Sequence, residues 1–129
     1  MLKIYFMRTE YIALKGALCM LTQKLIRKLL EEFIEACKKA PSSIVKVILF
    51  GSVARGDFYI DSDIDILVIS KNLKEAKNFF GKIADDLFLK YFVPISIVYV
   101  EPDRLLMNDR FIQGVLEEGK VLWVSKRMK

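Results

Sequence analysis

Two segments of the chain repeat apolar residues at helical spacing, and the segments between them have the pattern of short strands. Between residues 22 and 40 the apolar residues recur at spacings of three and four, which predicts a helix with one buried face. Thr22 is its expected N-cap, and a proline with two serines is expected to end it. A second helix is predicted over 72–90, with Asn72 as N-cap and the side chain of Glu75 reaching back to the start of the helix.

Short apolar runs rich in β-branched residues predict the strands of a sheet, and a glycine, a proline or polar residues flank most of them. The resulting order of helices and strands predicts one α/β (α+β) domain, with a small mixed β-sheet flanked by helices. We assign residues 20–129 to this domain and treat residues 1–19 as an N-terminal extension without a clear role. The strands are expected at 44–50, 63–70, 95–100 and 121–124, with a helical turn from residue 102 and a helix over 109–118.

Composition limits the classes of function. The chain has 129 residues, 53% of them hydrophobic and 29% charged, which is typical of a single globular domain. The formal net charge of +5 fits a surplus of solvated lysines, and it also fits a surface that meets a polyanion, so nucleic acid stays an alternative partner. No segment has the about 18 to 20 continuous apolar residues of a membrane span, and no membrane association is expected.

Histidine and cysteine usage narrows the chemistry further. The chain has no histidine, which excludes a Ser-His-Asp triad, a Cys-His dyad and zinc sites that rely on imidazole. Cys19 and Cys37 do not form a C-x-x-C pair, and we expect both to be small buried hydrophobic residues in a protein of the reducing cytoplasm. Catalysis would therefore depend on carboxylates, hydroxyls, lysine or arginine.

The stretch from Gly51 to Asp65 contains the candidate site. A buried strand is followed at once by Gly51 and Ser52, where glycine permits close approach of a ligand and the first amides of a helix could bind phosphate. Asp63 and Asp65 are two residues apart, so on a strand they project from the same face while Ile64 points to the core. Two adjacent carboxylates repel each other unless a cation lies between them, and Mg²⁺ prefers such oxygen ligands.

The spacing of these residues resembles a family signature. Gly51-Ser52-x-Ala-Arg55-Gly, five residues, then Ser-Asp63-x-Asp65 is similar to the motif of the minimal nucleotidyltransferase (MNT) family of the polymerase-β superfamily. The resemblance covers residues 20–124, weakly outside the motif, and includes the Glu-Gly-Lys-Val-Leu segment at 118–122. It implies a mixed sheet of polymerase-β type flanked by helices.

The resemblance also implies a function. Gly51 and Ser52 would hold the β- and γ-phosphates of a nucleoside triphosphate, usually ATP, and Asp63 and Asp65 would be the catalytic ligands of Mg²⁺ or Mn²⁺. Arg55 would contact phosphate or pair with an acidic residue of the 57–61 loop. The implied enzyme transfers AMP to a hydroxyl, and the tyrosine of a helical HEPN partner in a toxin–antitoxin pair is a candidate acceptor.

One position departs from the family pattern. Active members carry a third carboxylate on the next long strand, and the matching residue here is Ser96. Either another acid substitutes, with Asp61, Glu101 and Asp103 as candidates, or catalysis is lost and the chain is a nucleotide-binding or partner-binding module. A transferase that acts on small molecules or RNA ends is a weaker reading. For assembly, an apolar strand over residues 3–7 could add to a sheet edge of the same chain or of a partner, including a homodimer.

Overall fold

The computed structural model describes residues 21–56 and 63–126. The expectations for residues 1–19, for Cys19 and for the acids of the 57–61 loop lie outside the described residues. Among the described residues, no helix is long and apolar enough to cross a membrane. The elements in chain order are a helix over residues 21–37, β1 (Ile44–Phe50), α2 (Gly51–Arg55), β2 (Ile64–Ser70), α3 (Leu73–Tyr91), β3 (Ile95–Val100), the 3-10 helix η1 (Pro102–Leu106), α4 (Arg110–Glu118) and β4 (Lys120–Val124).

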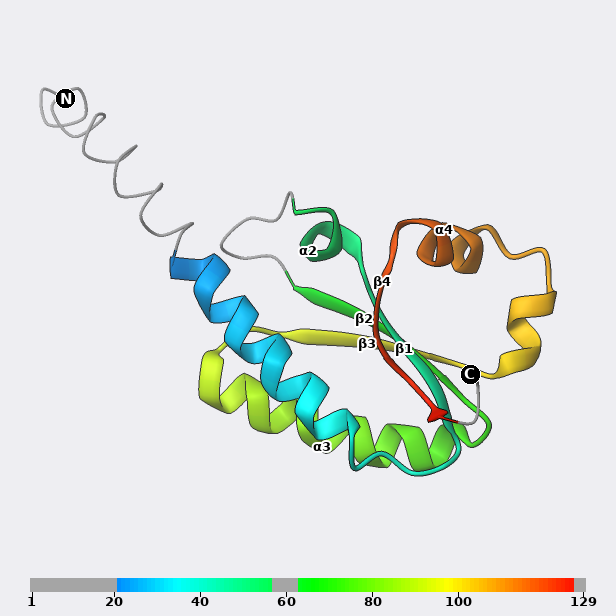
Figure 1. The fold of residues 1–129 in the computed structure, drawn as a ribbon, viewed down its shortest axis with the longest axis horizontal. Helices are drawn as coiled ribbons and strands as arrows, with labels where there is room; N and C mark the ends of the chain where they lie inside the picture. Colours follow the sequence, from blue (N-terminus) through cyan, green and yellow to red (C-terminus); the bar gives the residue numbers. More distant parts are fainter. Residues whose placement is uncertain (1–20, 57–62, 127–129) are drawn as a thin grey trace, which may run out of the picture.

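The four strands form one mixed sheet in the order β3-β2-β1-β4 (Figure 1). β1 pairs antiparallel with both β2 and β4, whereas β2 and β3 are parallel and are connected through α3. The strands β1 and β2 are buried on both faces, which explains why both read as almost continuous apolar runs. The predicted class, a small mixed sheet flanked by helices, is confirmed.

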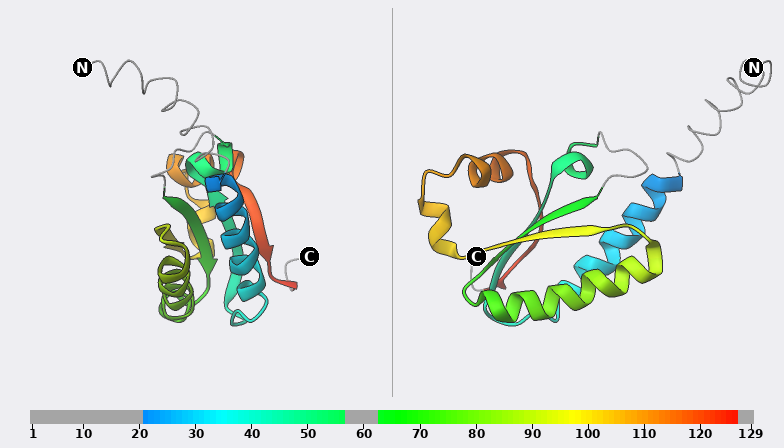
Figure 2. Two further views of the ribbon diagram at one scale, coloured as in Figure 1. Left: turned by 90° about the vertical axis from the view of Figure 1, so that its left-hand side faces the viewer. Right: turned by 180° about the vertical axis from the view of Figure 1, so that it is seen from behind.

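One face of the sheet is covered by the helix over residues 21–37 and by α3, which lie side by side (Figure 2). Their inner side chains meet in the rings of Phe33 and Phe80, which are both fully buried and stack with centroids 5.7 Å apart. Ile64 and Ile66 of β2 point into the same core with no exposed surface. Cys37 is fully buried there as expected, and burial raises the pKa of its thiol to about 12.

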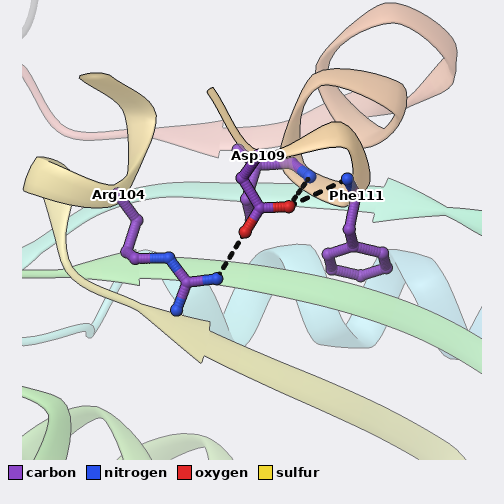
Figure 3. Close-up of polar contacts among 4 residues, drawn as sticks. Arg104, Asp109 and Phe111 are labelled. Carbon is purple, nitrogen blue, oxygen red and sulfur yellow. Dashed lines mark hydrogen bonds and ion pairs between the residues drawn. The ribbon is translucent and has the colours of Figure 1, made fainter. Parts of the chain in front are cut away.

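The opposite face carries a smaller core under α4. Asp109 caps α4 because its Oδ1 accepts hydrogen bonds from the amides of Phe111 (2.9 Å) and Ile112 (3.3 Å). The other oxygen of Asp109 accepts a 2.6 Å hydrogen bond from the guanidinium of Arg104, which links η1 to α4 (Figure 3). The ring of Phe111 meets the ring of Phe50 edge to face, so the cap fixes α4 over the end of β1.

Two details of capping differ from expectation. Residue 21 is already part of the first helix, so Thr22 lies inside the helix and cannot be its N-cap. Asn72 does cap α3 and accepts a hydrogen bond from the amide of Glu75, as predicted. The carboxylate of Glu75, however, accepts a hydrogen bond from the hydroxyl of Ser43, and the amide of Asn72 donates instead to the hydroxyl of Ser70. The buried serine at the end of β2 thus replaces the reciprocal half of the capping box.

Candidate active site

The backbone of Gly51 lies against the side chain of Asp65 where β1 passes into α2. Phe50 at the end of β1 pairs with Asp65 of β2, and Gly51 follows with a left-handed backbone (φ 76°). A Cβ atom on Gly51 would lie 2.3 Å from Oδ2 of Asp65. Glycine is therefore needed here both for its backbone conformation and for the space that the carboxylate occupies.

The two carboxylates lie at the same end of the sheet. Asp63 immediately precedes β2 and is exposed, and Asp65 is half-buried within the strand. Between them, Ile64 is fully buried and its amide donates a 3.0 Å hydrogen bond to the carbonyl of Pro94. Since Ile64 faces the core under α3, alternation along the strand places Asp65 on the side of the sheet that α4 covers.

Charge and burial act together on Asp65. Burial raises the pKa of its carboxyl, and the negative charge of Asp63 raises the pKa further, while Arg55 acts in the opposite direction. A carboxylate that is disfavoured in its charged form by a neighbouring carboxylate gains the most from a cation between the two. This donor set of two hard oxygen ligands fits Mg²⁺ or Mn²⁺.

A cleft of about 370 Å³ opens beside Gly51, between α2 and α4. Arg55 at the end of α2 crosses it to Glu118 at the end of α4, with 3.6 Å between Nη1 and Oε2. Both side chains are about half exposed, so this ion pair is weak enough to yield to a stronger anion. The cleft is lined by Phe50, Gly51, Arg55, Arg110, Phe111, Gly114, Val115 and Glu118.

The contribution of α4 to this cleft could not be inferred from spacing. Arg110 and Phe111 lie more than fifty positions after the Gly-Ser motif. They belong to no motif that the sequence shows. Only the resemblance at residues 118–122 pointed to this part of the chain, and it assigned no role to Glu118.

Ser96 occupies the position next to Asp65 on the neighbouring strand. In the parallel pairing of β2 with β3, Asp65 is the partner of Ser96 and Ile64 is the partner of Ile95. The position assigned to the third carboxylate is therefore occupied by an exposed serine, one strand away from the acidic pair.

Two of the three candidate substitutes are too far away. Glu101 and Asp103 follow the other end of β3, and at about 3.3 Å per residue Glu101 is roughly 16 Å from Ser96 along the strand. Asp61 lies outside the described residues. Within the described ranges, no three acidic or cysteine side chains are grouped so that they could hold a metal ion.

Residues 30–123 match the family model described as "Nucleotidyltransferase domain". Two relatives from Methanocaldococcus jannaschii are provisionally named protein adenylyltransferases. One is 35% identical over 108 residues, covering 78% of this chain and 74% of the relative. The other is 41% identical over 100 residues, covering 74% of this chain and 96% of the relative.

Solved structures share the architecture. A structure provisionally described as a minimal nucleotidyltransferase superposes with a TM-score of 0.56 and 26% identity, covering 76% of this chain and 93% of the other. A chain of a toxin–antitoxin complex with AMP-PNP superposes with a TM-score of 0.53 and 22% identity, covering 77% of this chain and 76% of the other. At that identity the second likeness shows the fold alone.

Proposed function

Because this chain belongs to the nucleotidyltransferase domain family, we propose that it transfers AMP from ATP to a hydroxyl group of a partner protein. The observation that supports the site is the close approach of Gly51 to Asp65, which brings the Gly-Ser turn against the acidic pair. Nucleotidyl transfer requires a phosphate-binding element next to a pair of carboxylates that can bind a metal ion.

The roles of the residues follow from their positions. Gly51 and Ser52 at the start of α2 would receive the β- and γ-phosphates, since the first amides of a helix have no partner within it. Asp63 and Asp65 would hold Mg²⁺ or Mn²⁺, which when bound neutralises charge on the phosphates. Arg55 would exchange Glu118 for phosphate, because a weak exposed ion pair is readily replaced by a multiply charged anion.

The transfer itself is an in-line displacement. The acceptor oxygen forms a bond to the α-phosphorus, and the bond from that phosphorus to pyrophosphate breaks. The hydroxyl proton passes to water, since β3 supplies a serine rather than a carboxylate beside the acidic pair. The residues that the structure describes thus contribute positioning and charge rather than a dedicated base.

The acceptor is proposed to be a protein. The relatives in M. jannaschii are provisionally named protein adenylyltransferases, and a chain of the same fold comes from a toxin–antitoxin complex. The names of the relatives support a protein as the acceptor. The HEPN-type helical partner and its tyrosine hydroxyl are what the family resemblance adds to this proposal. The buried free thiol of Cys37 agrees with a cytoplasmic setting.

A second candidate function is a nucleotide-binding or partner-binding module that no longer transfers AMP. The pairing of Asp65 with Ser96 favours this alternative, because the neighbouring strand brings no third charge to the site. The nucleotide-binding form of the module shares the nucleotide site with the enzyme and lacks only the transfer, whereas the partner-binding form needs no nucleotide.

The deciding experiment has two stages. Calorimetry with ATP, with and without Mg²⁺, tests the site, and the Asp63→Asn/Asp65→Asn double variant is the control. Metal-dependent binding that the double variant loses supports the nucleotide site, and incorporation of α-labelled AMP into the partner then supports the enzyme. Binding without transfer supports the module, and no binding at millimolar ATP rejects both nucleotide functions.

A further inference from the structure

The C-terminal end of α3 carries a cluster of exposed apolar side chains. Phe88, Leu89 and Phe92 are 42%, 71% and 77% exposed, and the rings of the two phenylalanines meet edge to face with centroids 6.3 Å apart. Within the part of the chain that the structure describes, these three side chains stay largely open to solvent. Adjacent exposed aromatic side chains of this kind mark interaction surfaces more often than solitary ones do.

The backbone at Phe92 is strained without any compensating burial. Phe92 ends α3 in the left-handed conformation (φ 58°, ψ 29°), and its amide donates a 2.7 Å hydrogen bond to the carbonyl of Phe88. Glycine or asparagine is the usual residue in this conformation, and a bulky aromatic residue there is rare. Strain that folding does not need is a feature of functional positions.

The cluster lies at the same end of the sheet as the acidic pair. Phe92 is two residues before Pro94, whose carbonyl accepts the hydrogen bond from the amide of Ile64. Asp63 and Asp65 flank Ile64 on both sides. A protein bound to the cluster would therefore be held next to the carboxylates, within roughly 20 Å by chain length.

The face of α3 that carries Phe88 and Phe92 indicates what kind of partner fits. Gly81, Asp85, Phe88 and Phe92 follow one another at spacings of four, three and four, which makes one stripe along the helix. A Cβ atom on Gly81 would contact nothing within 4 Å, so a partner could approach closely there. Asp85 has no hydrogen-bond or ion-pair partner among the residues that the structure describes, whereas Lys90 on the neighbouring side is paired with Glu32.

We propose that Phe88, Leu89 and Phe92 dock an amphipathic helix of the acceptor protein, with a lysine or arginine of that helix against Asp85. An apolar stripe with one unpaired acid is complementary to an apolar helix face flanked by basic residues. The proposal rests on the proposed function for the identification of the partner as the acceptor of AMP. Docking itself does not depend on catalysis.

The first test uses a peptide and the intact chain. The probe is a labelled amphipathic helix of about 18 residues, with leucines along one face and lysines on both flanks, and its counterpart has glutamates in place of the lysines. Fluorescence anisotropy should show that the lysine peptide binds more tightly than the glutamate peptide. Asp85→Lys should reverse that preference, and Phe92→Asn should weaken binding at least about tenfold.

Two controls separate docking from folding. Asparagine tolerates the left-handed conformation, so Phe92→Asn should not lower Tm. Leu106→Ser removes a leucine that is 89% exposed on η1, at the opposite end of β3, and should leave peptide binding unchanged. Equal binding by wild type and Phe92→Asn, or equal loss in Leu106→Ser, overturns the proposal.

The second test distinguishes docking from transfer. With the partner as acceptor, Phe92→Asn should raise KM for the partner at least about tenfold while the Kd for ATP stays unchanged. If the wild type transfers no AMP but binds the peptide through Phe92, the proposed function fails and the docking surface stands. Sedimentation that shows a dimer in the wild type and a monomer in Phe92→Asn would assign the surface to self-association and overturn the proposal.

Discussion

Gly51 leaves open the space that the carboxylate of Asp65 occupies, since a Cβ atom at position 51 would lie 2.3 Å from Oδ2 of Asp65. The contact joins the end of β1 to the neighbouring strand. It makes the conformation of the turn and the position of the carboxylate depend on each other, and the first prediction tests this dependence.

Gly51→Ala should destabilise the chain and abolish ATP binding. The left-handed conformation costs a residue with a Cβ about 1–2 kcal/mol, and the clash with Asp65 adds to that cost. Gly56→Ala is the matched control, because Gly56 has a similar φ of 79° but nothing within 4 Å of its Cβ position. Urea unfolding and ATP calorimetry should show a smaller loss of stability and retained binding for Gly56→Ala, and equal effects of the two variants would contradict the steric account.

Asp65→Asn should stabilise the metal-free protein at neutral pH and abolish metal-dependent ATP binding. The pKa of Asp65 is raised in the folded state, so its contribution to stability is fully present below the ordinary carboxyl pKa and is lost as pH rises through the raised value. Thermal unfolding in EDTA should therefore give the variant the higher Tm at pH 7, by a few degrees. The difference should vanish as the pH falls below the ordinary carboxyl pKa, where Asp65 is protonated in both the folded and the unfolded state.

Asp63→Asn serves as the companion variant. Removing the charge of Asp63 takes away one of the two causes that raise the pKa of Asp65. The pH dependence of stability should then shift to lower pH. A lower Tm for Asp65→Asn than for wild type at pH 7 in EDTA would contradict this electrostatic interpretation.

Ser96→Asp should increase AMP transfer, by about tenfold or more if a third carboxylate is what the site lacks. Position 96 is paired with Asp65 across the sheet, so the new carboxylate would join the acidic pair. Three neighbouring carboxylates repel, and Tm should fall in EDTA and recover with Mg²⁺. Ser96→Asn is the control without charge, and an equal gain in that variant would rule out the carboxylate as the cause.

Asp109→Ala should lower Tm and weaken ATP binding, because Asp109 holds α4 and with it one wall of the cleft beside Gly51. The hydrogen bond from Arg104 and those from the backbone hold the pKa of Asp109 below its ordinary value. Its contribution to stability is therefore present above the ordinary carboxyl pKa and lost as pH falls through the lowered value.

Asp109→Asn separates the two roles of the residue. Asparagine keeps an oxygen that can cap the helix but loses the charge that faces Arg104. Circular dichroism melts at pH 7 should place its Tm between those of wild type and Asp109→Ala. A Tm equal to that of the alanine variant would show that the ion pair, not the cap, fixes α4.

The elements of the fold followed closely from local patterns. β1 and β3 have the bounds that their apolar runs predicted, and α3 differs from its prediction by one residue at each end. Such segments are predictable because strand and helix periodicity is imposed by one buried face. The role of Glu75 was predicted wrongly because tertiary contacts bring the hydroxyls of Ser43 and Ser70 to the start of α3. Thr22 was predicted wrongly because the helix already includes residue 21.

The sequence by itself determined the class of fold, and its Gly-Ser turn and acidic pair resembled the family that the comparisons show. Those features depend on the spacing of residues that lie close together in the sequence, and a local pattern encodes that spacing directly. Tertiary structure alone decided that Ser96 is the neighbour of Asp65, that Glu118 reaches Arg55, and that α4 closes the cleft. These relations join residues that are 31 or more positions apart, and strand register and helix packing, which no local pattern encodes, bring them together.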